Sequence, residues 1–195
     1  MMKLTVTFHS QGRLLEGSLY LPQNPSEHLV GLLFEGSMTG ATRQLTQHIA
    51  REVSEEGFAC LVMDHSYYSE DEGAAQSWES PSKRTEDIHA ALSFLQRHST
   101  VNPEKIIGVG VSVGAEYLAQ VCRESNVCKG LILIQGPFDD AQNKAQDLDI
   151  PMVVVDETHL DSAIDETVMW ARTLFNGSFA DSPQAPLVDW SLADK

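Results

Sequence analysis

The sequence predicts an α/β protein with three layers, α/β/α, around a mostly parallel central sheet with an N-terminal antiparallel hairpin. After the hairpin, short apolar segments of strand length alternate five times with segments whose apolar residues recur every three or four positions, as in helices. Such alternation is typical of open, mostly parallel sheets with helices on both faces. The 195 residues, 42% of them hydrophobic, suffice for one sizeable core, so a single domain over residues 1–195 is expected.

The hairpin and the first central strand come at the start of the chain. Residues 4–8 and 14–21 are rich in Leu, Val, Thr and Tyr and flank a Ser-Gln-Gly turn, which favours two antiparallel strands. Residues 29–34 are apolar at both odd and even positions, which is typical of a strand buried on both faces. A loop is expected over residues 35–40.

The next elements are a helix, a strand and a long loop. Leu45, Ile49 and Val53 fall at i, i+4 and i+8, so a helix is expected over residues 41–56, ended by Gly57. Residues 58–63 form a second buried strand. The stretch over residues 65–82 is rich in Ser, Glu, Asp and Gly without a period, which indicates an exposed loop.

The second half of the chain repeats the alternation. Thr85 is expected to cap a helix whose apolar stripe is Ile88, Leu92 and Leu95. Asn102-Pro103 then turns the chain into the next strand. The remaining predicted elements are strands over residues 105–111, 130–134 and 152–155, a helix after Ser112, and a last helix that ends near Asn176.

A G-x-S-x-G motif, Gly110-Val111-Ser112-Val113-Gly114, lies where a predicted strand meets a predicted helix. In that context the motif is typical of a nucleophile elbow, a tight turn that exposes the serine hydroxyl at a helix N-terminus. The backbone N–H of Val113, with one from Gly36 or Ser37 after the first central strand, could hold a developing oxyanion. The alternative is a structural turn that uses a small residue.

These residues resemble the α/β-hydrolase superfamily, and within it the dienelactone-hydrolase-like group of small esterases and thioesterases. The resemblance is strongest over residues 57–136, through Gly-Phe-Ala-Cys-Leu-Val-Met-Asp at 57–64 and Val-Asn-Pro-Glu-Lys-Ile at 101–106, which leads into the motif. It implies a minimal, lidless α/β-hydrolase fold with Ser112 as nucleophile. Dienelactone-hydrolase-like sequences place a Glu where this chain has Glu35, and there it contacts a resting cysteine nucleophile. Glu35 is therefore a candidate site residue, and the alternative is a strand-end Glu that faces solvent.

A serine needs a neighbouring base, usually a histidine oriented by a carboxylate. In the superfamily the acid follows the nucleophile and the histidine comes last. Asp161 is the preferred acid, ahead of Asp156 and Glu157. No histidine follows His159 in the sequence, so His159 is the candidate base, and the alternative is a surface ion-pair partner. His65 is a weaker candidate for the base.

The charge and the cysteine content of the sequence argue against several classes of partner. Lys and Arg number 13 against 28 Asp and Glu, a formal net charge of −15, so nucleic acid and anionic membranes should be repelled. No apolar run approaches the length of a transmembrane helix, and the polar start lacks a secretory h-region, so a cytoplasmic protein is expected. The three cysteines are expected to be small buried hydrophobes, and the sequence predicts no metal and no cofactor.

The sequence favours a serine hydrolase that acts on a small ester, thioester or lactone. Its expected partners are this small molecule and, as an alternative to a monomer, further copies of the same chain in a homo-oligomer. The absence of a lid-sized insertion between residues 136 and 151 predicts a shallow pocket. The alternative is a catalytically inactive binding or interaction protein that keeps the elbow. A third reading is an enzyme whose base comes from another protomer.

Overall fold

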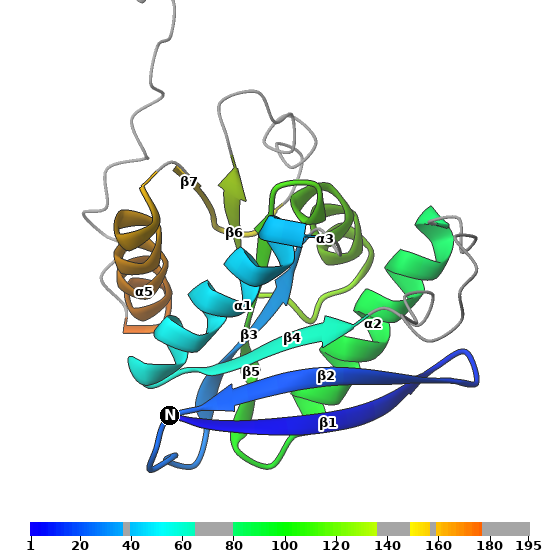
Figure 1. Cartoon of the computed structure of the whole chain (residues 1–195), viewed down its shortest axis with the longest axis horizontal. Helices are drawn as coiled ribbons and strands as arrows, with labels where there is room; N and C mark the ends of the chain where they lie inside the picture. Colours follow the sequence, from blue (N-terminus) through cyan, green and yellow to red (C-terminus); the bar gives the residue numbers. More distant parts are fainter. Residues whose placement is uncertain (37–39, 65–79, 136–148, 157–158, 177–195) are drawn as a thin grey trace, which may run out of the picture.

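A seven-stranded sheet forms the centre of the protein (Figure 1). The computed structural model describes residues 1–36, 40–64, 80–135, 149–156 and 159–176. Within them the strands are β1 (Met2–Ser10), β2 (Arg13–Leu21), β3 (Leu29–Glu35), β4 (Ala59–Asp64), β5 (Val101–Val111), β6 (Gly130–Gln135) and β7 (Met152–Asp156). The helices are α1 (Gly40–Glu55), α2 (Pro81–Arg97), α3 (Gly114–Glu124) and α5 (Leu160–Asn176).

The strands run in the order β1-β2-β4-β3-β5-β6-β7. β1 pairs with β2, and β2 with β4, in antiparallel register, whereas every pair from β4 to β7 is parallel. The predicted fold class, a mostly parallel sheet with an N-terminal antiparallel hairpin, is confirmed. Because the central strands are parallel, their carboxyl ends meet at one edge, where ligands bind in such sheets.

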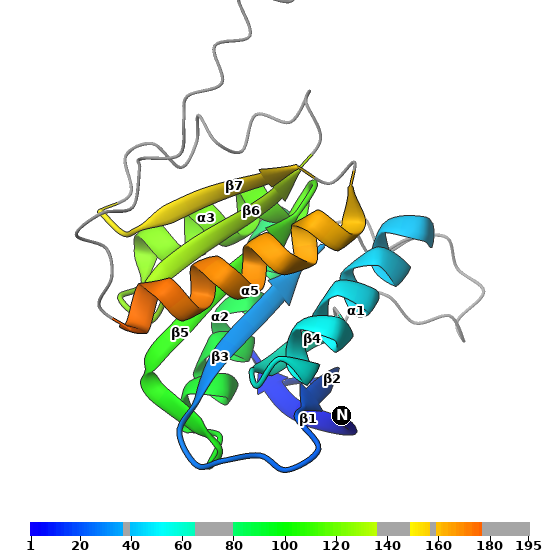
Figure 2. The same cartoon turned by 90° about the vertical axis from the view of Figure 1, so that its left-hand side faces the viewer.

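Helices cover both faces of the sheet, α2 and α3 on one and α1 and α5 on the other (Figure 2). β3 shows how one strand serves both layers, because Leu33 packs towards α2 and α3 while Leu32 and Phe34 pack towards α1 and α5. The apolar character of β3 at every position therefore has the predicted cause, burial on both faces.

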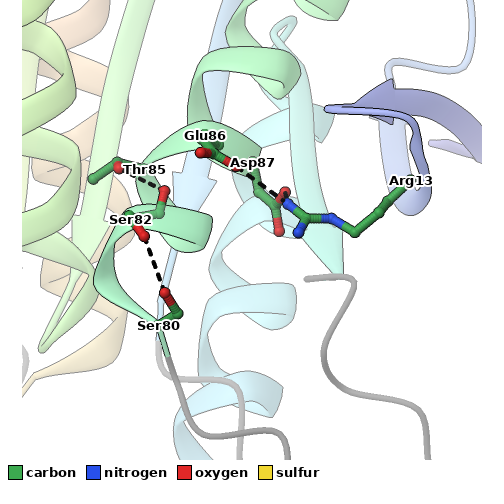
Figure 3. A network of polar contacts seen from close by, with 6 residues as sticks. All are labelled: Arg13, Ser80, Ser82, Thr85, Glu86 and Asp87. Atoms are coloured by element: carbon green, nitrogen blue, oxygen red, sulfur yellow. Dashed lines mark hydrogen bonds and ion pairs between the residues drawn. The ribbon is translucent and has the colours of Figure 1, made fainter.

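Two predicted boundaries in this region are wrong. α2 begins at Pro81 instead of Thr85, because proline has the φ of a first helical turn and needs no N–H partner there. Thr85 lies inside the helix, where its hydroxyl donates to the Ser82 carbonyl at 2.9 Å (Figure 3). β5 begins at Val101, which pairs with Leu29, and the register then shifts before the regular ladder, so Asn102-Pro103 lies within an irregular strand.

The three cysteines, Cys60, Cys122 and Cys128, are free and buried, as predicted. Burial raises the pKa of the Cys60 thiol well above its ordinary value. A hydrogen bond with Cys128, followed by burial, has the same effect on the pKa of Cys122. A raised pKa keeps a thiol protonated, and the thiolate is the reactive form of cysteine. Cys60 and Cys122 therefore contribute to packing. In the described part of the chain, no helix is both long and apolar enough to cross a membrane.

Candidate active site

The carboxyl ends of β3, β5, β6 and β7 lie side by side at one edge of the sheet. The ladder pairs Glu35 with Gly110, Val111 with Ile134, and Gln135 with Asp156. The residues after β3, β5 and β7 are those that the sequence predicts to carry chemistry. The topology therefore places the predicted site residues at one edge, in the order set by the strands.

Ser112 forms a tight turn between β5 and α3. Its φ of +51° lies in the left-handed region, which is uncommon for any residue other than glycine. Its N–H donates to the Ile134 carbonyl at 2.8 Å, and its carbonyl accepts from the Ala115 N–H at 2.9 Å. The half-buried serine is thus fixed to the neighbouring strand on one side and to the start of α3 on the other.

Two glycines of the motif permit close contacts around this turn. A Cβ at Gly110 would overlap the backbone of Ala115, so only glycine lets the first turn of α3 lie directly on β5. A Cβ at Gly114 would overlap backbone atoms of Glu35 and Gly36. The start of α3 therefore packs against the loop that leaves β3, which brings the two predicted sources of oxyanion donors together.

Val113 lies between Ser112 and the first residue of α3. Its backbone is helical, with φ −52° and ψ −31°, and its side chain is exposed by 51%. An N–H at a helix N-terminus has no partner within the helix and lies at the positive end of the helix dipole. Gly36 ends the described part of the loop after β3, and Ser37 lies outside the described residues.

Glu35 is buried and paired with Arg84 of α2. The Arg84 Nε donates to Glu35 Oε1 at 2.7 Å, and both side chains are only 2% exposed. The Arg84 Nη2 donates to the Gly36 carbonyl at 2.7 Å, and the guanidinium carbon lies 4.3 Å from the centre of the Tyr117 ring on α3. The alternative of a solvent-facing Glu35 is therefore wrong.

Sequence reasoning missed Arg84, although a signal was present. Arg84 lies four residues before Ile88, the first residue of the apolar stripe of α2, so the two side chains share one helix face. A cation on the buried stripe of a helix needs a buried anion as its partner. In a chain with a predicted strand-end Glu35, that spacing favours the pair that the structure contains.

His159 and Asp161 lie at the start of α5. Both residues are exposed, and the His159 carbonyl accepts from the Ala163 N–H at 2.9 Å, which begins the helix. β7 is two strands from β5, so their ends are about 10 Å apart. Asp156 ends β7 and is exposed, while Glu157 and His65 lie outside the described residues.

The structure thus gathers Ser112, Val113, Glu35 and Gly36 into one cluster. It places His159 and Asp161 at the same sheet edge but beyond the end of β7. In the parts of the chain with described positions, no group of three or more His, Cys, Asp or Glu side chains could hold a metal ion.

Comparison with curated proteins gives partial matches. The uncharacterized protein PA2218 of Pseudomonas aeruginosa is 33% identical over 108 residues, which are 54% of this chain and 29% of that protein. The quorum-quenching protein AidA of Acinetobacter baumannii is 28% identical over 63% of this chain and 40% of its own. Thiohydrolase aneE of Aspergillus aculeatus is 31% identical over 60% and 36%. The matches span well under half of each relative, and no protein-family model matches.

Solved structures match over most of the chain. Est1E from Butyrivibrio proteoclasticus superposes with a TM-score of 0.68 at 12% identity, covering 88% of this chain and 99% of that one. A dienelactone hydrolase from Anabaena variabilis gives 0.64 at 16% identity, covering 90% and 97%. XC6422 from Xanthomonas campestris, a serine hydrolase without a lid, gives 0.61 at 12%, covering 94% and 98%.

The sheet order, the layers of helices and these superpositions define the chain as having the α/β-hydrolase fold. Within that class it resembles the lidless and dienelactone-hydrolase-like structures, which confirms the predicted resemblance.

Proposed function

We propose that the protein is a serine hydrolase that cleaves a small ester, thioester or lactone through Ser112. The observation that carries the proposal is the left-handed φ of Ser112, at +51°, on a turn whose flanking glycines pack against α3 and the loop after β3. Strained backbone at a strand–helix turn is typical of a nucleophile elbow. Structures and relatives named as hydrolases support the same reaction class.

In the proposed reaction, Ser112 Oγ attacks the acyl carbon of the substrate and loses its proton to a base. The Val113 N–H and an N–H of Gly36 or Ser37 bind the negative charge that develops on the carbonyl oxygen. Collapse of the tetrahedral intermediate breaks the bond to the alcohol or thiol, which takes the proton from the base. Water, activated by the same base, then attacks the acyl-serine, releases the acid and restores the hydroxyl.

His159 is our candidate for the base, with Asp161 or Asp156 orienting it. It follows β7, whose carboxyl end lies at the same sheet edge as Ser112 and about two strand spacings from the end of β5. In structures without substrate, the hydrogen bonds between catalytic residues are often long. We therefore base the choice of His159 on its sheet edge, which it shares with Ser112, and not on a hydrogen bond already formed.

The neighbourhood of Ser112 favours a small, uncharged acyl group. Val113 presents an apolar side chain that is half exposed beside the serine, and the charge of Glu35 is matched by Arg84. An acyl chain of a few carbons would cover Val113 without needing a deep pocket.

The proposal is tested with purified protein and p-nitrophenyl esters of increasing acyl length, together with acetylthiocholine and a simple lactone. We expect turnover of p-nitrophenyl acetate, with kcat/KM falling as the acyl chain lengthens. Absence of turnover across the whole panel, by protein that is folded by circular dichroism, would contradict the proposal.

Replacing His159 with Gln should reduce kcat for p-nitrophenyl acetate on the order of 10²-fold or more, because general-base catalysis contributes about that much. Gln keeps the size and a hydrogen-bonding group but cannot take a proton. His89, which contacts Glu124 on the surface, provides the matched control, and His89→Gln should leave kcat unchanged. Full activity of His159→Gln would exclude His159 as the base.

The second candidate function is a catalytically inactive binding protein that uses the same edge. The exposed position of His159 beyond β7 is the observation that favours it. A binding protein would bind small esters without turnover, so the same panel distinguishes the two functions.

A further inference from the structure

We infer that Val113 is a specificity-determining residue whose side chain binds the acyl chain of the substrate. The inference rests on the proposed function and deepens it, because it names the group that distinguishes one acyl chain from another. The Val113 N–H is already a proposed oxyanion donor, but any residue except proline supplies a backbone N–H. The side chain is what makes this position specific.

The Val113 side chain adds nothing to the core of the described part of the chain. It is 51% exposed, and it belongs to neither of the two apolar clusters that flank the sheet. The residues that follow it in α3 differ in this respect, because Gly114, Ala115 and Leu118 are buried. Burial therefore does not account for an apolar residue at position 113.

Helix formation does not account for valine at this position either. Val113 lies at the N-terminal boundary of α3, and its side chain makes no capping hydrogen bond. Ser, Thr, Asp and Asn are favoured at such boundaries because their oxygens accept from free N–H groups, whereas valine is among the least favoured residues. A β-branched side chain also loses rotamer freedom in a helix. Such a departure from local preference is expected at functional sites.

Its position also distinguishes Val113 from the other large apolar side chains that the described residues expose. These are Met1, Met2, Leu4, Leu14 and Met169. The first four lie at the N-terminal hairpin, and Met169 lies within α5. Val113 is the member of this group that follows the carboxyl end of a central strand, β5. An exposed apolar side chain at this edge is available to the apolar part of a substrate.

An acyl chain bonded to Ser112 must lie close to Val113. The two Cα atoms are about 3.8 Å apart, and in the proposed reaction the acyl oxygen accepts from the Val113 N–H. The turn is fixed, since the Ser112 N–H donates to the Ile134 carbonyl at 2.8 Å. Valine on a helical backbone has one strongly preferred rotamer, so its methyl groups form a fixed apolar surface. The first carbons of the acyl chain remove that surface from water.

The test compares p-nitrophenyl acetate and butanoate as substrates of the native protein, Val113→Thr and Val113→Leu. Thr keeps the shape of valine but replaces a methyl group with a hydroxyl, and Leu extends the apolar surface. We expect the butanoate-to-acetate ratio of kcat/KM to fall about two- to fivefold in Val113→Thr and to rise in Val113→Leu, since each CH₂ removed from water changes a binding constant about fourfold. The control, Leu14→Thr, alters a 57% exposed side chain of β2 and should keep the native ratio.

A second measurement needs no turnover. Ser112→Ala should bind p-nitrophenyl butanoate without forming an acyl-enzyme. In methyl NMR spectra of this variant, the Val113 resonances should shift during the titration while those of Leu14 stay in place. The inference is therefore tested even if the native protein hydrolyses none of the esters, a result that overturns the proposed function instead.

Three results would overturn the inference. One is a native butanoate-to-acetate ratio in both Val113 variants, together with Val113 methyl resonances that do not shift. Another is a lower ratio in Val113→Leu with a native ratio in Val113→Thr, which would make Val113 a steric limit instead of a binding surface. The third is a change that follows the length of the alcohol in a series of acetates, which would place the leaving group over Val113.

Discussion

Replacing Ser112 with Ala should reduce ester turnover on the order of 10⁴-fold or more, because it removes the hydroxyl proposed to form the acyl-enzyme. The substitution removes only the hydroxyl oxygen. Since Ala and Ser tolerate a left-handed φ about equally poorly, the strain at +51° is nearly the same in both proteins. The loss should therefore appear in kcat, with the stability towards urea unchanged.

Ser125 provides the matched control, because it is a serine at the other end of the same helix. Ser112 lies just before α3, and Ser125 lies just after it. Its hydroxyl is buried and has no hydrogen-bond partner among the described residues, so Ser125→Ala should cost little stability and no activity. The measurement is the initial rate with p-nitrophenyl acetate for the native protein and both variants. Substantial turnover by Ser112→Ala would mean that another group performs the attack.

Replacing Arg84 with Met should lower the free energy of unfolding by about 3–5 kcal/mol, because it removes the cation that pairs with the buried Glu35 carboxylate. This is the largest stability effect that we expect from a single change of a charged residue. The measurement is urea denaturation followed by tryptophan fluorescence. The exposed pair of Arg172 and Glu56 is the comparison, and Arg172→Met should cost less than about 1 kcal/mol.

The double variant Glu35→Leu with Arg84→Met should recover most of this loss. Both buried charges are then absent, and replacing a buried ion pair with apolar residues of similar size is often neutral or stabilising. The two single losses should therefore sum to well over the loss in the double variant. Additive losses, or an Arg84→Met variant as stable as Arg172→Met, would show that the pair is not energetically coupled.

The fold could be predicted from the sequence because burial of the sheet on both faces produces recognisable patterns of apolar residues. Strands such as β3 are apolar at every position, and the helices carry stripes that face the sheet. The boundaries that were wrong have local causes. Pro81 starts α2 earlier than Thr85, and Val101 pairs with Leu29 before an irregularity that accommodates Pro103.

The candidate site could be predicted only in part. The turn at Ser112 is marked by the glycines that its geometry needs, Gly110 and Gly114. Arg84 is marked only by its four-residue spacing to Ile88, and a helix predicted to be capped by Thr85 leaves position 84 outside the helix. The partner of a buried charge depends on which elements the tertiary fold brings together, here the end of β3 and the start of α2.

The central claim, that Ser112 is an activated nucleophile, is tested most directly by a fluorophosphonate probe and mass spectrometry of the labelled peptides. We expect one adduct on the native protein, located at Ser112, at a pH between about 6 and 9, the range around the ordinary histidine pKa. The adduct should be absent from Ser112→Ala and present in Ser125→Ala. Native protein that stays unlabelled throughout that range, or an adduct on another residue, would contradict the claim.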